Sequence, residues 1–249
     1  MEERITSRKN PLVQQTRKLL TSRKARRELG LFVSDGTKLL EEAVRHCQGL
    51  ETVFLSDGVE AQVPENCRVI RVSREVMEAI SPMETPQGAV FLCRLPQEVP
   101  FQPEKGMLLL DGIQDPGNLG TILRTADAWN VKVALLEGCA DPFSHKVVRS
   151  SMGAVFRRDV AVTTWDQARA ALQQAGIPVA VTALNDQARD IRSASVGTMA
   201  VVIGSEGQGV RQEVLQAADE ALIIPMNPHC ESLNAAVAAT AVMWQMGKM

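Results

Sequence analysis

The 249-residue sequence predicts an α/β protein with a C-terminal parallel-sheet domain and a smaller N-terminal α/β domain. From Met107 onward, short apolar runs alternate with helical patterns, as in a parallel sheet that helices cover on both faces. A proline-rich stretch at residues 95–105 precedes this alternation and indicates a linker. We therefore expect domains at residues 1–94 and 106–249.

In the N-terminal domain, Asn10-Pro11 opens a helical pattern that carries Leu12 and Leu19, and Ser73 is suited to cap a helix that ends near Ile80. The other expected elements are strands at residues 31–33, 52–55, 68–72 and 88–93 and a helix at 38–47. In the C-terminal domain we expect strands at 107–110, 131–136, 160–164, 178–183, 199–203 and 221–224, and helices at 118–129, 145–156, 166–175, 210–218 and 232–246.

Composition excludes several classes of protein. An apolar fraction of 45% allows a full core, whereas the absence of any long apolar run argues against a membrane span or a secretory signal. Five scattered cysteines, without a CxxC pair or a histidine at zinc spacing, predict free thiols in the cytoplasm and no metal site.

Charge is distributed unevenly along the chain. The net charge is −2, but residues 1–30 carry nine Lys/Arg against three acidic residues. Such a basic cluster is suited to nucleic-acid phosphates, and its candidate RNA-binding residues are Arg23, Lys24, Arg26 and Arg27. A solvated amphipathic helix is the alternative interpretation.

Three segments follow predicted strands: DGIQDPGNLG at residues 111–120 with Arg124, IGSEGQG at 203–209, and IPMNPHCESLNAAVAA at 224–239. In this order they resemble the motifs of the SpoU/TrmH family of RNA ribose 2′-O-methyltransferases, in the SPOUT superfamily. The resemblance covers residues 106–247. It implies a trefoil knot, which is otherwise rare in proteins, a homodimer whose active sites the partner completes, and S-adenosylmethionine as cofactor.

The glycine-rich loop also has a chemical interpretation of its own. Its glycines do not follow G-x-G-x-x-G, and the Glu206 carboxylate disfavours a phosphate ligand, whereas it suits a cationic one such as S-adenosylmethionine. Alone, the loop is equally compatible with a tight strand-to-helix turn. The resemblance implies cofactor contacts from Thr182, Ala183, Leu184, Gly204, Glu206, Gly207, Gly209, Ile224, Met226, Ser232, Leu233 and Asn234.

The resemblance further implies a catalytic set of Asn118, Arg124, Glu206, Ser232 and Asn234. Methyl transfer to a ribose 2′-hydroxyl needs in-line alignment and removal of a weakly acidic proton. Family accounts make the arginine the base, whereas a permanently charged guanidinium is better suited to hold a phosphate and stabilise the alkoxide. The sequence leaves both roles open for Arg124.

Three further residues are weaker candidates. Arg149, in the segment between the first two motifs, is a candidate for RNA phosphate contact, and Ser151 is a weaker one. His229 occupies the third motif and is a possible proton acceptor, although a lone histidine is more often incidental.

The N-terminal residues also resemble a known domain. Residues 5–7, 10–11, 32–36 and 40–43 resemble the substrate-binding domain of ribosomal-RNA members, whose fold is like that of a ribosomal protein that binds kink-turn RNA. Asp35 departs from that pattern, in which glutamate is commoner.

The sequence and the resemblance thus predict S-adenosylmethionine-dependent 2′-O-methylation of structured RNA, with ribosomal RNA favoured and the same reaction on transfer RNA as an alternative. An inactive ribosome-assembly factor is the alternative from another class, and the five intact catalytic residues argue against it. A nicotinamide-dependent enzyme fails on glycine spacing. The target nucleotide and any role in antibiotic resistance are encoded in no linear motif, because RNA sites are mostly recognised by shape and by unstacked bases.

Overall fold

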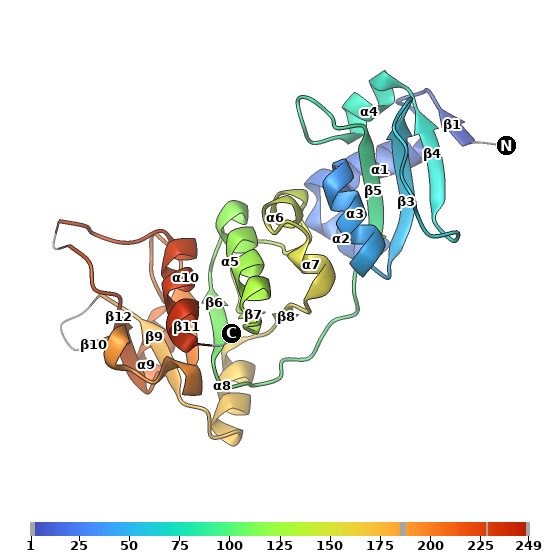
Figure 1. Ribbon diagram of the computed structural model, residues 1–249. Coiled ribbons are helices and arrows are strands. Elements are labelled where there is room, and N and C mark those ends of the chain that lie inside the picture. The colour runs from blue at the N-terminus through green and yellow to red at the C-terminus, as the bar shows by residue number, and fades with distance from the viewer. Residues whose placement is uncertain (1–2, 185–187, 228, 248–249) are drawn as a thin grey trace. The chain divides into compact units, whose positions relative to one another are not determined.

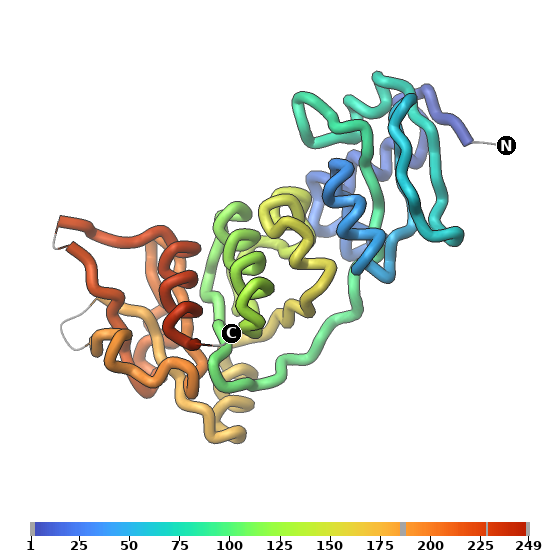
Figure 2. The backbone as a smooth tube through the Cα atoms, viewed as in Figure 1, coloured from blue at the N-terminus to red at the C-terminus, as the bar shows by residue number. Residues whose placement is uncertain are grey.

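The computed structural model describes residues 3–184, 188–227 and 229–247, so Met1, Glu2 and Pro228 of the segments discussed above lie outside the described residues. Contacts divide the chain into two compact units. Unit 1 comprises Met1–Gln97 and Asp141–Arg157, and unit 2 comprises Glu98–Ala140 and Arg158–Met249. A boundary drawn along the sequence assigns residues 141–157 to the C-terminal domain, whereas their contacts are with the N-terminal residues. The proline-rich linker runs from β5 (Ala89–Arg94) to β6 (Met107–Asp111) without helix or strand (Figure 2).

Unit 1 contains a five-stranded mixed sheet in the order β1-β4-β3-β5-β2 (Figure 1). The β5 strand pairs antiparallel with both β2 and β3, and the other pairs are parallel. Its elements are β1 Glu3–Ile5, α1 Pro11–Thr21, α2 Arg23–Leu29, β2 Leu31–Asp35, α3 Thr37–His46, β3 Leu50–Ser56, β4 Arg68–Val72, α4 Arg74–Ile80, β5 Ala89–Arg94, α6 His145–Ser150 and α7 Ala154–Arg157.

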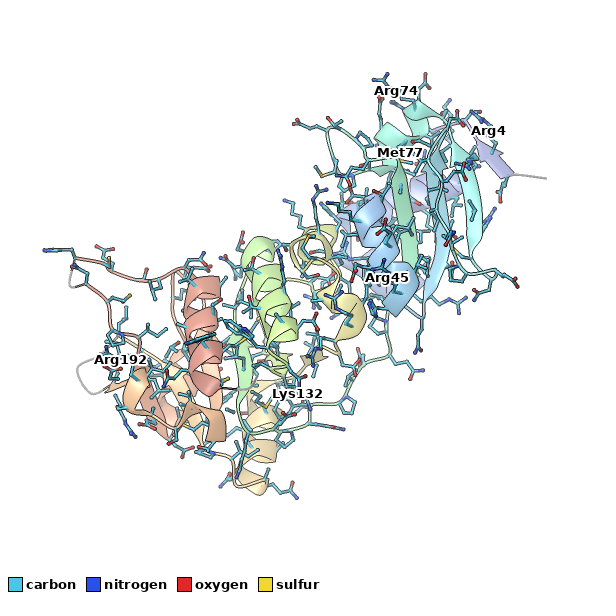
Figure 3. All side chains as sticks on the ribbon, in the orientation of Figure 1. Arg4, Arg45, Arg74, Met77, Lys132 and Arg192 are labelled. Atoms are coloured by element: carbon cyan, nitrogen blue, oxygen red, sulfur yellow. The ribbon has the colours of Figure 1, made fainter. Side chains whose placement is uncertain are left out.

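Apolar side chains hold this unit together on both sides of its sheet. Met77 of α4 is buried, whereas Arg4, Arg45 and Arg74 are exposed (Figure 3). Three aromatic contacts attach the 141–157 segment to the sheet. The ring centroids of Phe32 lie 5.2 Å from Phe143 and 6.2 Å from Phe156, and Phe91 lies 6.4 Å from Phe156. Residues 141–157 are thus an integral part of the core of unit 1.

Unit 2 contains a seven-stranded sheet in the order β10-β12-β9-β11-β6-β7-β8, and every pair in it is parallel. Its elements are β6 Met107–Asp111, α5 Pro116–Ala128, β7 Val133–Leu135, β8 Ala161–Val162, α8 Trp165–Gln174, β9 Val179–Thr182, β10 Arg189–Asp190, η1 Ile191–Ser193, η2 Val196–Thr198, β11 Ala200–Gly204, α9 Gln212–Ala217, β12 Glu220–Ile223 and α10 Ala235–Met246.

Helices cover both faces of this sheet, as the alternating pattern predicts. On one face, α8 and α9 pack Leu172 and Val214 against Met107, Leu109 and other buried strand residues. The α5 and α10 helices lie side by side, and α10 also contacts β11 (Figure 1). Successive side chains of a strand point to opposite faces of the sheet. Met107 and Leu109 are buried on one face, and Leu108 and Leu110 are buried on the other, so both faces of β6 are covered. No helix in the described part of the chain is long and apolar enough to cross a membrane.

The structure corrects three local expectations. The single helix predicted at residues 145–156 is two short helices, because Met152 and Gly153 adopt positive φ angles of 50° and 84°. The last helix begins at Ala235 rather than at residue 232, with Asn234 as its N-cap. Ser73 precedes α4 as predicted, but its hydroxyl is buried and makes no capping hydrogen bond.

Candidate active site

The three motifs meet at one edge of the parallel sheet of unit 2. The first motif follows β6, the second follows β11 and the third follows β12. The β11 strand pairs with β6 on one side and with β9 on the other, and β9 pairs in turn with β12. Because all these strands are parallel, their carboxyl ends lie at the same edge, which is where open α/β sheets bind ligands.

A cavity of about 540 Å³ lies at this edge. Its volume is within the range of small-molecule sites. Eleven of the twelve residues predicted to contact the cofactor line it: Thr182, Ala183, Leu184, Gly204, Glu206, Gly207, Gly209, Ile224, Met226, Ser232 and Leu233. Asn234 is the twelfth, and it caps α10 without lining the cavity.

Among the described residues, nine that the sequence did not predict also line the cavity: Ile203, Ser205, Gln208, Val210, Leu215, Leu222, Glu231, Ala235 and Ala238. Ser205 and Gln208 lie between glycines of the second motif, so their position in that loop was a usable signal. Leu215 of α9 and Ala238 of α10 face the cavity only because of how their helices pack, which no local pattern records.

The glycine-rich loop closes on itself at its base. The backbone N–H of Ser205 donates to the carbonyl of Gly209 at 3.1 Å, and the N–H of Gly209 donates back to Ser205 at 2.9 Å. A Cβ atom on Gly204 would lie 2.1 Å from the carbonyl carbon of Gly209, so only glycine fits there. Gly209 itself has a φ of +66°, which also favours glycine. The loop is therefore a narrow ring beside the cavity.

A chain of hydrogen bonds joins one polar residue from each motif. The amide nitrogen of Asn234 donates to Oδ1 of Asn118 at 2.9 Å, and the amide nitrogen of Asn118 donates to Glu206. The Oδ1 atom of Asn234 accepts from the backbone N–H groups of Ala236 at 2.9 Å and Val237 at 3.3 Å. Capping α10 therefore fixes the direction of the Asn234 amide, which in turn orients Asn118.

Two members of the predicted catalytic set take no part in this series of hydrogen bonds. Ser232 is exposed and lines the cavity without a hydrogen bond from its hydroxyl to another described residue. Arg124 is exposed on α5, and its guanidinium contacts no hydrogen-bonding or acidic partner among the described residues. His229 is exposed, does not line the cavity, and donates its backbone N–H to Asn227 at 3.0 Å.

The predicted RNA-binding set needs one correction. Arg23, Lys24 and Arg27 are exposed on α2, but Arg26 is buried. Its Nη2 and Nε atoms lie 2.7 and 2.8 Å from Oδ2 of Asp141, and its Nη1 donates to the Leu19 carbonyl at 2.6 Å. Arg26 is a structural residue of unit 1, because its guanidinium is buried and bound to Asp141 and the Leu19 carbonyl.

Arg149 and Ser151 also have structural partners in unit 1. Nη1 of Arg149 lies 3.3 Å from Oδ2 of Asp35, although the arginine side chain stays 39% exposed. Burial raises the pKa of Asp35, and the charge of Arg149 lowers it in part. The Ser151 hydroxyl is buried and donates to the Val148 carbonyl at 2.8 Å, so it is unavailable to RNA.

These features define a class: an α/β protein with a small-molecule cavity built from three loops at the carboxyl ends of a parallel sheet. Comparison with known proteins identifies the family within this class. The SpoU rRNA Methylase family matches residues 105–244, and the MRM3-like substrate binding domain matches residues 10–90. This chain belongs to the SpoU rRNA Methylase family.

Full-length relatives support the assignment. The chain is 32% identical to the 23S rRNA (guanosine(2553)-2′-O)-methyltransferase RlmP of Bacillus subtilis, over 98% of this chain and 99% of that protein. Its structure is similar to that of the AdoMet-bound rRNA methyltransferase from Sinorhizobium meliloti, with a TM-score of 0.85 and 28% identity. The match covers 98% of this chain and 97% of that chain. The crystal structure of an RNA 2′-O ribose methyltransferase is also similar, with a TM-score of 0.82 and 28% identity, over 98% of this chain and 97% of that chain.

Proposed function

We propose that this protein transfers a methyl group from S-adenosylmethionine to a ribose 2′-hydroxyl of ribosomal RNA. The observation that carries the proposal is the hydrogen-bonded chain from Asn234 through Asn118 to Glu206, beside a cavity lined by the second and third motifs. Support comes from the full-length similarity to RlmP of Bacillus subtilis and to an AdoMet-bound rRNA methyltransferase.

The residues at the cavity fit S-adenosylmethionine. Leu222, Ile224 and Met226 offer apolar contact area for an adenine ring, and the glycine ring offers backbone groups. Among the described residues that line the cavity, the charged ones are Glu206 and Glu231, both acidic, which suits a cationic ligand. When bound there, the cofactor supplies an electrophilic methyl group on its sulfonium.

Arg124 acts on the RNA in this proposal. Its guanidinium is exposed and uncommitted within the described residues, so it is available to a phosphate next to the reacting ribose. Because arginine keeps its charge in proteins, we assign it the stabilisation of the developing 2′-alkoxide rather than removal of the proton. Asn118, held between Asn234 and Glu206, orients the hydroxyl for in-line attack.

Unit 1 recruits the RNA in this proposal. Arg23, Lys24 and Arg27 are exposed on α2, and Arg17 and Lys18 are exposed on the preceding helix α1. Positive charges grouped on two consecutive helices attract a phosphate backbone without specifying its sequence. The match of residues 10–90 to a substrate-binding domain supports this role.

We also propose that the protein is a homodimer with a knotted unit 2. Support for the dimer is the exposed apolar surface of α10, where Trp244 is 62% and Val237 is 53% exposed. Trp244 contacts Trp129 with a centroid distance of 5.7 Å, so the surface continues beyond α10. Support for the knot is the family resemblance alone. Sedimentation of the purified protein tests the dimer, because a monomer at micromolar concentration would contradict it.

The test of the function is transfer of labelled methyl from S-adenosylmethionine to unmodified ribosomal RNA, followed by alkaline hydrolysis. Label in alkali-resistant dinucleotides is expected, because a 2′-O-methyl group blocks cleavage at that linkage. Transfer RNA serves as the comparison substrate. Cofactor binding without transfer to any ribosomal RNA would contradict the proposed substrate, and absence of cofactor binding would contradict the enzyme.

A further inference from the structure

Arg211, just after the glycine ring, makes an unusually large set of polar contacts. Its backbone N–H donates to Oδ2 of Asp111 at 2.8 Å, and its Nε donates to Oδ1 of the same carboxylate at 2.7 Å. Its Nη2 donates to Glu137 at 3.1 Å, and its Nη1 lies 2.9 Å from Glu213. One arginine thus joins the end of β6, the segment after β7 and the start of α9.

The burial of Asp111 explains why Arg211 is held firmly at the end of β6. It is the last residue of β6, and its side chain is 0% exposed. A buried carboxylate is costly unless it is paired with a cation and hydrogen-bonded. Both of its oxygens are used by Arg211, one for the backbone and one for the side chain. The position of the Arg211 backbone is therefore fixed relative to β6.

The position of the Arg211 backbone matters because Arg211 directly follows a segment that lines the cavity. Residues 203–210, eight consecutive residues, all line the cavity. The paired hydrogen bonds of Ser205 and Gly209 close the ring at its base, so its two ends are tied together. The N-terminal end of the ring continues from β11, and its C-terminal end is held by Arg211. Neither Asp111 nor Arg211 lines the cavity itself.

We propose that Asp111 and Arg211 are positioning residues for the cofactor: they hold the glycine ring in the conformation that binds S-adenosylmethionine and keeps Glu206 next to Asn118. This inference rests on the proposed function. Without the pair, the ring populates other conformations, and the apparent cofactor affinity falls by the fraction that remains competent. The rate of methyl transfer at saturating cofactor changes much less, because bound cofactor itself selects the competent ring conformation, which places Glu206 next to Asn118, and Arg211 touches no reacting group.

The test is Arg211→Gln, which shortens a half-exposed side chain and leaves the backbone N–H in place. We expect the dissociation constant of S-adenosylmethionine, measured by calorimetry, to rise about tenfold, the size of one lost charge-assisted hydrogen bond to a buried carboxylate. At saturating cofactor, the single-turnover rate of methyl transfer should stay within about threefold of wild type. Arg211→Lys should restore most of the affinity, since it keeps the charge opposite Asp111. Backbone amides of residues 205–210 should exchange hydrogen faster in Arg211→Gln.

The matched control is Arg158→Gln. Arg158 is also a half-exposed arginine of unit 2, and its Nε donates to Asp127 at 2.9 Å, away from the cavity. It should lower thermal stability without changing cofactor affinity. An Arg211→Gln protein that binds the cofactor within twofold of wild type would overturn the positioning role, as would an equal loss in Arg158→Gln. A wild-type protein that binds no cofactor would instead overturn the proposed function.

Discussion

Arg26→Ala should destabilise unit 1 severely, although Arg26 belongs to a basic run that looks solvent-exposed in the sequence. The Arg26 side chain is 6% exposed and its partner Asp141 is 13% exposed. Removing the arginine leaves the Asp141 carboxylate nearly buried without a cation, and it removes the donor to the Leu19 carbonyl. Breaking one partner of a buried ion pair costs about 3–5 kcal/mol, and we expect that loss in the free energy of unfolding.

Urea unfolding at neutral pH, followed by circular dichroism, measures the loss. The control is Arg27→Ala, one residue further along α2, where the side chain is exposed and contacts no ion-pair partner among the described residues. Its cost should stay within about 0.5 kcal/mol. The double variant Arg26→Met/Asp141→Leu should recover part of the stability, because no unpaired charge remains. A loss below about 1 kcal/mol in Arg26→Ala would refute the reasoning.

Three other changes test the site and unit 1. Arg124→Ala should lower the single-turnover rate by about 100-fold with the S-adenosylmethionine dissociation constant within about twofold, and unchanged turnover would exclude its role. Charge reversal of Arg23, Lys24 and Arg27 should weaken RNA binding and make the plot of log affinity against log salt shallower by about two, whereas an unchanged slope would mean a merely solvated surface. Burial lowers the pKa of His145 below its usual 6.5, so its contribution to stability is present above pH 6.5 and is lost as the pH falls. His145→Gln should therefore flatten the decline in unfolding free energy between pH 7 and pH 5, and an equally steep decline would contradict this.

Local patterns predicted most of the secondary structure because the signals are local. Asp115 accepts a hydrogen bond from the backbone N–H of Asn118 at 2.8 Å and caps α5, as expected of an Asp-Pro-Gly turn before a helix. The apolar run that ends at Asp111 forms β6, since continuous apolar runs suit strands buried on both faces. The break at Met152 could not be predicted in this way, because a positive φ at a methionine has no sequence signature.

Contacts between distant residues account for what sequence reasoning missed. Asn118 and Glu206 are 88 residues apart, and Asn118 and Asn234 are 116 apart, so only the strand order brings them together. The family resemblance placed them at one site without supplying their hydrogen bonds. Arg26 failed as an RNA contact for the same reason, because its partner lies 115 residues away. A charge pattern cannot distinguish a paired guanidinium from a free one.

The assignment of residues 141–157 to unit 1 affects how the protein can be divided. The chain passes between the two units three times: after residue 97, after residue 140 and after residue 157. A protease that cuts once in the linker therefore leaves the N-terminal fragment bound to the rest of the molecule through Phe32, Phe91 and Arg26. A fragment that ends at residue 94 would expose the aromatic side chains that Phe143 and Phe156 now cover. Expression of unit 1 as an independent domain thus requires the 141–157 segment to be fused back to it or supplied in trans.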